Sequence, residues 1–179
     1  MEKKNIVYIA TSLDGYIADS KGGLDWLHSI PNPNQDDMGF LAFMNRVDAL
    51  VMGRNTFETV IGFDVDWPYT KPVFVLSNSL NEIPQSHADK AFLVKGALNT
   101  VLKEIHDKGF LNLYIDGGTT IQNFLRENLI DELIISRIPV LLGGGVPLFG
   151  NLPQLMAFDF VESTTYLNQI TQCRYKRKK

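Results

Sequence analysis

The sequence contains very few cysteine and histidine side chains. Cys173 is the only cysteine among 179 residues, which excludes an internal disulfide and a cysteine-based zinc cluster and is typical of a reducing compartment. The three histidines, His28, His87 and His106, are too scattered in the sequence to indicate a metal site or a nucleophilic triad. We therefore expect no protein-bound metal.

Strong charge and long hydrophobic runs are also missing. The formal net charge is -3, and the only basic run is the last six residues, so we expect no nucleic-acid surface. No apolar stretch is long enough to span a bilayer, and the sequence opens without the apolar core and cleavage site of a signal peptide. These absences predict a cytoplasmic protein that binds neither nucleic acid nor a membrane.

The chain does contain 45% apolar residues, in short runs that alternate with helical patterns. Six runs rich in Val, Ile and Leu are typical of buried strands: Ile6–Ala10, Ala49–Met52, Val73–Leu76, Phe92–Val94, Leu113–Ile115 and Leu133–Ile138. Between them, four segments carry apolar residues at helical spacing: Asp36–Arg46, Thr56–Ile61, Ala97–Lys108 and Thr120–Asn128. This order predicts an α/β fold with a mostly parallel central sheet and helices on both faces.

The pattern changes after Pro153, where two strand-like runs follow each other. These runs, Phe158–Tyr166 and Gln169–Lys176, predict a C-terminal antiparallel hairpin with Leu167-Asn168 as its turn. No linker or repeat interrupts the chain, so we expect a single domain over residues 1–179. The edge hairpin and the apolar region Leu133–Leu142 allow a homodimer.

One strand-to-helix junction, Leu113 to Leu125 with the sequence LYIDGGTTIQNFL, indicates a ligand site. Gly117 and Gly118 lie at the carboxyl end of a strand, where open α/β sheets bind ligands, and they leave the first N–H groups of the next helix accessible to a phosphate. Thr119 and Thr120 add hydroxyl donors. The same glycines also suit a tight turn with no ligand, so this junction alone is a weak signal.

Two further strand ends carry compatible chemistry. In Met52-Gly-Arg-Asn-Thr, Arg54 adds a guanidinium to a helix start and Thr56 lies in the first helical turn, which suits a phosphate monoester. A third strand ends in Leu76-Ser-Asn-Ser, where Ser77 and Asn78 offer small polar groups. Three such strand ends together predict an anionic, nucleotide-like ligand more strongly than any one of them.

In sequence order, these segments resemble a known superfamily. The series SLDGYIA, MGRNTFETV, FVLSNSL, IDGGTTIQNFL and LIDELIISRIPVLLGGGVPLF covers nearly the whole chain. It is similar to the dihydrofolate reductase-like fold, and most similar to the reductase domain of the bifunctional riboflavin-biosynthesis deaminase/reductase. The Met-Gly-Arg-x-Thr segment is shared with dihydrofolate reductases, whereas the DGG and LIDEL…LLGGG runs are similar to the riboflavin enzymes.

The resemblance implies an NADPH-dependent reductase, with cofactor contacts that transfer residue by residue. Gly53, Arg54 and Thr56 would hold the adenosine half and its 2′-phosphate, with Ser77 and Asn78 beside them. The pyrophosphate would be held by Gly117, Gly118, Thr119 and Thr120. Ala10 and Ile17 would lie against the nicotinamide ring, where hydride transfer requires a dry apolar wall.

The resemblance also implies a catalytic carboxylate early in the first long helix, and Asp37 has the corresponding spacing. It stands 16 positions before Gly53. Its apolar surroundings favour use as an acid, and Ser136 aligns with a threonine that partners this carboxylate in dihydrofolate reductases. An equally good interpretation is that Asp36 and Asp37 only cap the helix and complement its dipole.

The rest of the substrate end is less constrained by the sequence. We expect Trp26, Met38 and Leu41 to contribute substrate contacts. Asp14 is better explained as a turn residue over the nicotinamide than as a catalyst, although a shift in register would make Asp14 or Asp25 the acid. The Leu142-Gly-Gly-Gly run is better explained as a bulged connection than as a phosphate cradle.

Two departures from the family pattern restrict the function. The chain lacks the His-x-Glu and Cys-x-x-Cys signature of the zinc deaminase domain, so it can only be a stand-alone reductase. It also lacks the Trp-x-x-Pro-x-[Asp/Glu] segment usual in dihydrofolate reductases. We therefore predict reduction of a pterin-like or ribosylaminopyrimidine-like heterocycle. The alternative is an NADP-binding module without turnover of its own.

Overall fold

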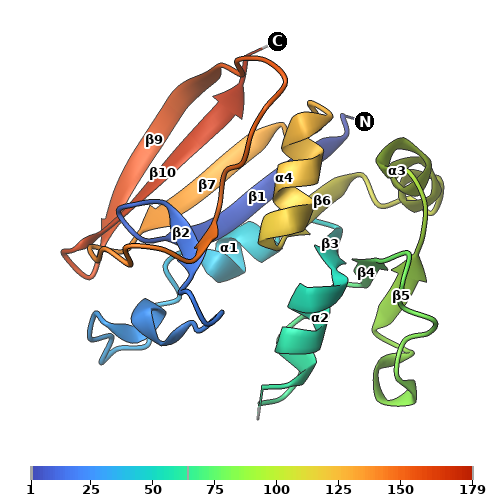
Figure 1. Ribbon diagram of the computed structural model, residues 1–179, viewed down its shortest axis with the longest axis horizontal. Coiled ribbons are helices and arrows are strands. Elements are labelled where there is room, and N and C mark those ends of the chain that lie inside the picture. Colours follow the sequence, from blue (N-terminus) through green and yellow to red (C-terminus); the bar gives the residue numbers. More distant parts are fainter. Residues whose placement is uncertain (1, 64, 179) are drawn as a thin grey trace.

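The predicted strands form one eight-stranded sheet in a computed structural model that describes residues 2–63 and 65–178 (Figure 1). The strand order is β5-β4-β3-β6-β1-β7-β10-β9, with every pair parallel except β7–β10 and β10–β9. The sheet strands are β1 Lys4–Thr11, β3 Ala49–Gly53, β4 Val73–Leu76, β5 Ala91–Val94, β6 Asn112–Asp116, β7 Glu132–Arg137, β9 Phe158–Tyr166 and β10 Ile170–Arg177. The predicted fold class is confirmed.

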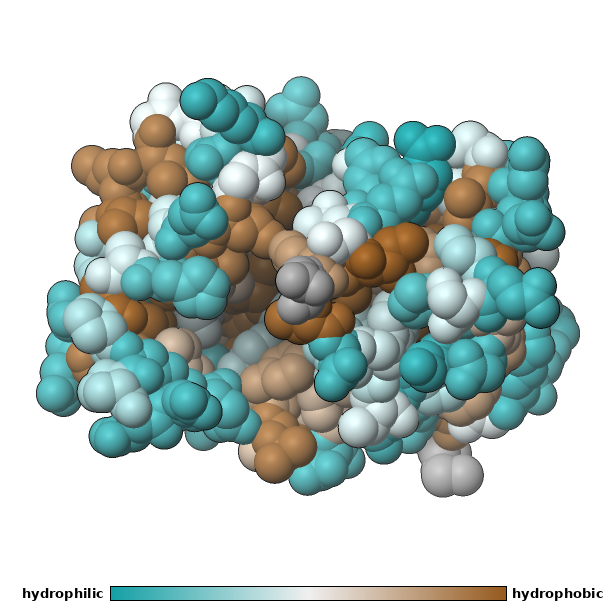
Figure 2. Space-filling view, turned by 90° about the horizontal axis from the view of Figure 1, so that it is seen from below, coloured by the Kyte–Doolittle hydropathy of each residue, from teal (hydrophilic) through white to brown (hydrophobic). Residues whose placement is uncertain are grey.

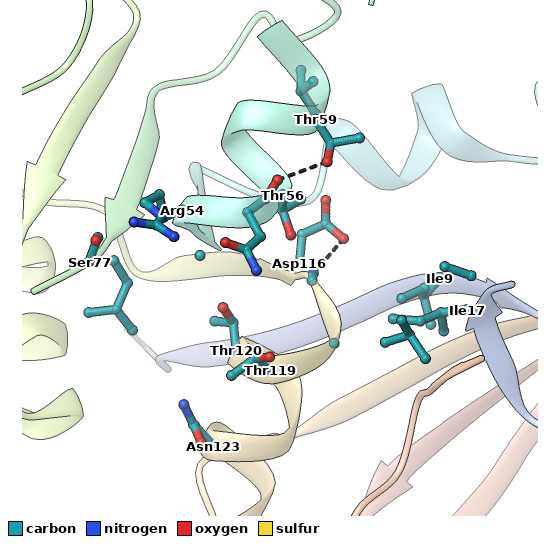
Figure 3. Close-up of a pocket in the computed structure, with 18 of the residues that line it drawn as sticks. Ile9, Ile17, Arg54, Thr56, Thr59, Ser77, Asp116, Thr119, Thr120 and Asn123 are labelled. Atoms are coloured by element: carbon teal, nitrogen blue, oxygen red, sulfur yellow. Dashed lines mark hydrogen bonds between the residues drawn. The ribbon is translucent and has the colours of Figure 1, made fainter. Parts of the chain in front are cut away.

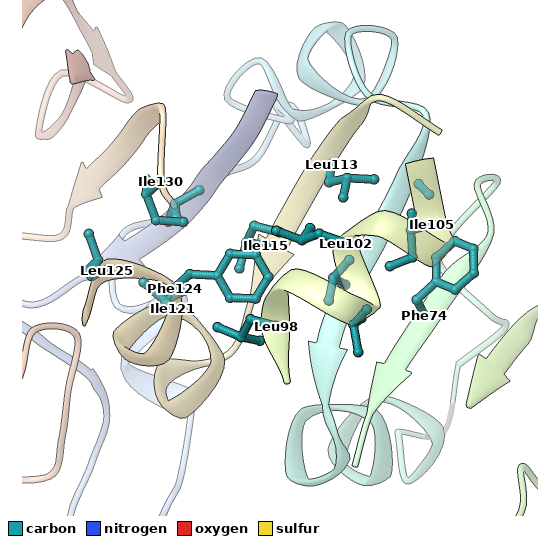
Figure 4. Packing of buried hydrophobic residues seen from close by; sticks show 14 of the residues in the cluster. Phe74, Leu98, Leu102, Ile105, Leu113, Ile115, Ile121, Phe124, Leu125 and Ile130 are labelled. Carbon is teal, nitrogen blue, oxygen red and sulfur yellow. The ribbon is translucent and has the colours of Figure 1, made fainter. Parts of the chain in front are cut away.

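Helices cover both faces of this sheet because its central strands are apolar on both sides. In β3, Ala49 and Val51 pack into one core, whereas Leu50 and Met52 pack into the other. Helices α3 (Leu98–Asp107) and α4 (Gly118–Arg126) close the first core, shown in Figure 4, and helices α1 (Phe40–Met44) and α2 (Arg54–Ile61) close the second. In the described part of the chain, no helix is long and apolar enough to cross a membrane.

The first helix is much shorter than the predicted segment 36–46. Met38 and Gly39 have positive φ angles of 53° and 85°, which a right-handed helix cannot accommodate, so α1 begins only at Phe40. The segment before it is an ordered loop in which the Asp36 and Asp37 carboxylates accept backbone N–H groups. The prediction of a helix start at Asp36 is therefore wrong, because these aspartates build the loop that precedes the helix.

The C-terminal hairpin follows the prediction closely. Leu167 and Asn168 both have positive φ, 51° and 56°, as the two central residues of a type I′ turn require. The hairpin joins the sheet through β10, whose Cys173 pairs with Ile135 of β7. Strand β9 is left at the edge of the sheet.

A small two-stranded sheet and two short 3₁₀ helices were not predicted. Strands β2 (Tyr16–Ala18) and β8 (Val146–Pro147) pair with each other, and the 3₁₀ helices are Asp25–His28 and Gln85–His87. The glycine run before β8 packs against the turn before β2, where the Asp14 carboxylate accepts the N–H groups of Leu142 (3.1 Å) and Gly143 (2.8 Å). This arrangement agrees with a connecting role for the glycine run and with a turn-shaping role for Asp14.

A buried ion-pair network joins the amino end of β7 to its neighbours. The side chain of Glu132 is 3% exposed and lies 2.7 Å from Arg46 and 3.1 Å from Arg174. Arg174 also pairs with Glu162 of β9 at 2.6 Å. This network lies at the end of the sheet opposite the carboxyl ends of the parallel strands. It ties the segment just after α1 to β7, β10 and β9.

Candidate functional site

A large cleft opens at the carboxyl ends of the parallel strands. Its volume is about 1020 Å³, and the view in Figure 2 shows a hollow with hydrophobic surface inside and hydrophilic side chains around it. Strands β1, β3, β4 and β6 all end at its wall. Every residue predicted to contact the cofactor lines this cleft: Ala10, Ile17, Gly53, Arg54, Thr56, Ser77, Asn78, Gly117, Gly118, Thr119 and Thr120.

The start of α4 is suited to an anion. No side chain caps this helix start, and Gly117 precedes it with φ 88°. The N–H groups of the first turn are therefore available, with the positive end of the helix dipole behind them. Thr119 is exposed at this point, whereas Thr120 is 3% exposed and packs toward Gly53. A pyrophosphate could approach the bare backbone here.

The structure requires glycine at positions 117 and 118 for two different reasons. At Gly117 the positive φ and the adjacent Thr56 hydroxyl, which any Cβ would overlap, both exclude a side chain, so the chain geometry alone requires glycine. At Gly118 φ is ordinary for a helix, and an added Cβ would lie 2.8 Å from Cδ1 of Ile17, at the cleft wall. The turn therefore explains Gly117, and close approach across the cleft explains Gly118.

One end of the cleft is cationic and rich in hydroxyl groups. Arg54 Nη1 donates to Ser79 Oγ at 3.2 Å, and the Ser77 and Ser79 hydroxyl oxygens lie 3.3 Å apart. The Arg54 guanidinium is 3.6 Å from the Glu58 carboxylate in the next helical turn. Figure 3 shows Arg54 and Ser77 together at this end. Asn78 instead accepts the N–H of Gly96 at 3.0 Å and so holds the loop before α3.

The other end of the cleft is apolar. Ile9 and Ile17 lie there in Figure 3, well separated from Arg54. Ala10, Leu27 and Val146 are among the other apolar residues that line the cleft. The cleft therefore runs from a cationic, hydroxyl-rich end to an apolar one.

A second cavity of about 310 Å³ adjoins the apolar end, and the two share Ala10 and Leu27 as lining residues. Asp37, Met38 and Ser136 line this second cavity, as their predicted roles require. The structure does not bring the other two predicted substrate residues to either cavity: Trp26 lies in the 3₁₀ helix 25–28, and Leu41 is 67% exposed on α1.

A hydrogen-bonded network connects Tyr8, Met38 and Ser136, which line the second cavity. Gln172 Nε2 donates to the hydroxyl oxygens of Tyr8 and Ser136, both at 3.0 Å. The Tyr8 hydroxyl in turn donates to the Met38 carbonyl at 2.7 Å. Gln172 and Tyr8 were missed in the sequence because each lies within a strand, without a motif around it. Only the β7–β10 pairing, which places Gln172 opposite Ser136, could have indicated the link.

Asp37 is exposed, so the predicted apolar surroundings of its carboxylate are not found, whereas its capping role and its access to a cavity both are. Its carboxylate accepts the N–H groups of Gly39 (3.0 Å) and Leu41 (2.8 Å), as the side chain of a capping residue does. The same carboxylate lines the second cavity, as Ser136 does, whereas the neighbouring Asp36 accepts the Met38 N–H at 2.7 Å and does not line it. The two aspartates are therefore distinguished by access to the cavity.

Asp116 is a carboxyl group of the cleft that sequence reasoning did not select. It ends β6 in the centre of the cleft, and its Oδ1 accepts the N–H of Gly117 at 2.8 Å (Figure 3). Burial raises the pKa of Asp116 to about 6, although the hydrogen bonds from Gly117 and Tyr114 act in the opposite direction. Near neutral pH this group therefore holds an unfavourable buried charge.

We expect Asp116→Asn to stabilise the cofactor-free protein at pH 7.5 but not at pH 4. The folded-state pKa lies above the unfolded value, so the folded state binds more protons between these values and loses stability as pH rises through about 6. Removing the charge should recover up to about 3 kcal/mol at pH 7.5. Urea unfolding at both pH values measures this difference.

The matched control is Asp107→Asn on α3. The hydrogen bond from Lys103 lowers the pKa of Asp107, so its removal should give no gain in stability at pH 7.5. An Asp116→Asn protein with the same stability change at both pH values would contradict the assignment of a destabilising charge in the cleft.

The geometry of the cleft agrees with comparisons to known proteins. Residues 3–172 match the family model of the RibD C-terminal domain. The chain belongs to this family. A relative from Bacillus subtilis, the uncharacterized protein YwjB, is 36% identical over 179 residues and covers 99% of both chains. The family match and this relative therefore both extend over nearly the whole chain.

Three solved structures show the same fold. A candidate riboflavin biosynthesis protein from Shewanella sp. PV-4 has a TM-score of 0.96 and 61% identity, with 98% of this chain and 99% of that chain covered. The Thermotoga maritima deaminase/5-amino-6-(5-phosphoribosylamino)uracil reductase has a TM-score of 0.74 and 13% identity, over 99% of this chain and 57% of that chain. Dihydrofolate reductase from Enterococcus faecalis, complexed with NADP(H), has a TM-score of 0.67 and 17% identity, over 98% and 97%.

These matches establish a dihydrofolate reductase-like fold of the RibD C-terminal type, as the sequence resemblance implied. The chain spans only about half of the bifunctional enzyme. The reductase-like fold is thus shown for this protein. The cofactor and substrate have to be inferred from the residues that line its cavities.

Proposed function

We propose that the protein is an NADPH-dependent reductase of a pterin-like or ribosylaminopyrimidine-like heterocycle. The observation that carries this proposal is the single cleft that collects all of the predicted cofactor residues. Its polarity matches a dinucleotide phosphate, because a guanidinium and an open helix start lie at one end and an apolar wall at the other. The adjoining cavity lies at the apolar end, where a substrate would meet the nicotinamide.

Different residues of the two cavities would carry the separate steps of such a reaction. Arg54, Ser77 and the start of α4 would bind the phosphates, while Ala10 and Ile17 would exclude water from one side of the nicotinamide. NADPH, when bound, supplies the hydride. Asp37 would orient the heterocycle and assist the accompanying protonation, with the Ser136 hydroxyl as its neighbour.

A nucleotide-binding module without turnover remains the second candidate. It is favoured by one observation: the Asp37 carboxylate already accepts two backbone N–H groups, so a purely structural role for it is satisfied. A screen of NADPH oxidation against dihydrofolate and the ribosylaminopyrimidine phosphate separates the two. Oxidation dependent on either compound supports the reductase, and cofactor binding without oxidation of any heterocycle supports the module.

Cofactor preference tests the cleft assignment directly. We expect the protein to bind NADPH much more tightly than NADH, and Arg54→Ala to remove most of that preference. Loss of a charge-assisted contact to the 2′-phosphate should weaken NADPH binding roughly ten- to hundredfold, with little effect on NADH. Fluorescence titration of both nucleotides measures the ratio.

Glu58→Gln is the control for this variant. It removes the carboxylate that pairs with Arg54 while leaving the guanidinium in place, so the NADPH preference should be kept or increased. Equal affinity of the unmodified protein for NADPH and NADH would refute the assignment of the 2′-phosphate site to Arg54.

A further inference from the structure

Asp116 brings a negative charge into the middle of the large cleft. It ends β6, the strand between β3 and β1, and it lies between the Arg54 end of the cleft and the apolar end (Figure 3). Its hydrogen-bond donors, the Gly117 N–H at 2.8 Å and the Tyr114 hydroxyl, are both uncharged. Neutral donors stabilise a carboxylate without cancelling its charge, so Asp116 carries a full negative charge when it is ionised.

Contacts with β1 hold this carboxyl group close to the apolar end. The Tyr114 hydroxyl that bonds Asp116 also donates to the Tyr8 carbonyl at 2.9 Å, so the carboxyl lies beside β1. Tyr8 and Tyr114 pack on the core of the α1 and α2 face, and residues two positions further along each strand point to the same face. Ala10, which is predicted to lie against the nicotinamide ring, therefore shares this face of the sheet with Asp116.

The second residue predicted to lie against the ring is also close to this part of the chain. An added Cβ on Gly118, two positions after Asp116, would lie 2.8 Å from Cδ1 of Ile17. A ring between Ala10 and Ile17 would therefore lie beside the Asp116 carboxyl. Apolar walls screen charge poorly compared with water, so the charge of Asp116 acts on this position strongly.

Other charged groups that line the cleft do not share this position. Arg54 lies at the opposite end, and Arg126 and Glu127 belong to the far end of α4. Tyr69 is near Asp116, but burial raises the pKa of its phenol and the charge of Asp116 acts in the same direction, so the phenol stays neutral. Among the described lining residues, Asp116 is the charged group beside the predicted ring position.

The two forms of the proposed cofactor differ in charge only at the nicotinamide ring. Loss of a hydride, which is a proton with two electrons, leaves the ring one unit more positive, whereas the phosphates are the same in NADP⁺ and NADPH. Repulsion between Asp116 and these phosphates therefore weakens the binding of both forms equally and cancels in the ratio of their affinities. Attraction between Asp116 and the positive ring does not cancel.

We propose that Asp116 determines the redox preference of the cleft by favouring NADP⁺ over NADPH through attraction to the oxidised ring. This inference rests on the proposed reductase function and deepens it. The buried carboxylate is unfavourable in the cofactor-free protein, and an oxidised ring supplies the counter-charge that it lacks there. Because stabilising the oxidised form favours departure of the hydride, Asp116 also makes the bound cofactor a stronger donor toward the heterocycle.

The test is the ratio of the dissociation constants for NADP⁺ and NADPH, measured by isothermal titration at pH 8. The Asp116 carboxyl is ionised at this pH, since burial raises its pKa only to about 6. We expect Asp116→Asn, whose amide oxygen can still accept the Gly117 N–H, to shift the ratio roughly tenfold toward NADPH. This shift corresponds to about 30 mV in the potential of the bound couple. Asp116→Glu keeps the charge and should retain most of the native ratio.

Glu58→Gln is the matched control because it removes the same charge at the Arg54 end. The Glu58 side chain is 52% exposed and lies 3.6 Å from the Arg54 guanidinium, so its loss should change both affinities together and leave their ratio unchanged. An unchanged ratio in Asp116→Asn, a shift toward NADP⁺, or an equal shift in Glu58→Gln overturns the proposal while leaving the reductase function in place. Failure of the unmodified protein to bind either nucleotide overturns the proposed function as well.

Discussion

Replacing Asp37 with asparagine should lower the rate of heterocycle reduction by roughly 10²–10⁴, the usual contribution of a positioned acid or base. Among the described residues that line the second cavity, Asp37 is the only carboxylate, and the change removes it. NADPH affinity should hold because Asp37 does not line the large cleft. Single-turnover reduction of the substrate found by screening, followed at the NADPH absorbance, measures the effect.

Asp36→Asn is a close control for this experiment. Asp36 caps the same loop by accepting the N–H of Met38, but it lies outside the lining of the cavity. It should therefore keep near-normal turnover while sharing any effect of a weakened loop. If Asp37→Asn and Asp36→Asn lose rate equally, the loop structure is what matters and the catalytic role of Asp37 is wrong.

The second large effect is expected on stability. Glu132→Gln should reduce the free energy of unfolding by about 2–3 kcal/mol, somewhat less than for a fully buried pair, since Arg46 and Arg174 retain some contact with solvent. The neutral amide keeps the shape but leaves both guanidinium groups without their buried counter-charge. Urea denaturation at pH 7.5 measures the change.

Glu162→Gln is matched to this variant because it removes a different carboxylate from the same arginine. Glu162 is 58% exposed, and an exposed pair of this kind contributes only about 0.2–1 kcal/mol. Because the network lies at the sheet edge away from the cleft, cofactor affinity should be unchanged in both folded variants. A loss for Glu162→Gln as large as that for Glu132→Gln would contradict the importance of burial.

The residues that line the large cleft could be gathered from the sequence because they lie in short local segments. Gly53 with Arg54, Ser77 with Asn78, and Gly117 with Thr120 each lie where a strand ends and the next segment begins. Parallel strands bring such ends to one edge of the sheet, so recognising the strands was enough to gather these residues in one cleft. The fold class could be predicted because apolar strand-like runs alternate with helical segments along the chain.

The substrate end could not be predicted as well because it depends on contacts between distant segments. Gln172 contacts Tyr8 only after β10 has paired with β7, on the side of β7 away from β1. The positive φ of Met38 shortens α1 and turns Asp37 toward the cavity, and no periodicity in the sequence reports this. The raised pKa of Asp116 likewise results from burial by several elements.

The position of β1 in the middle of the sheet has a consequence for the order of folding. Its register pairs Ile6 with Tyr114 of β6 and with Glu132 of β7, more than a hundred residues away. At about 5–20 residues per second of synthesis, β1 waits for roughly 5–25 s before either partner exists. Amide exchange in a chain arrested before residue 112 should find β1 unprotected. During biosynthesis, the first strand made thus has no partner until β6, Asn112–Asp116, has been synthesised, and its apolar side chains stay accessible to chaperones over that interval.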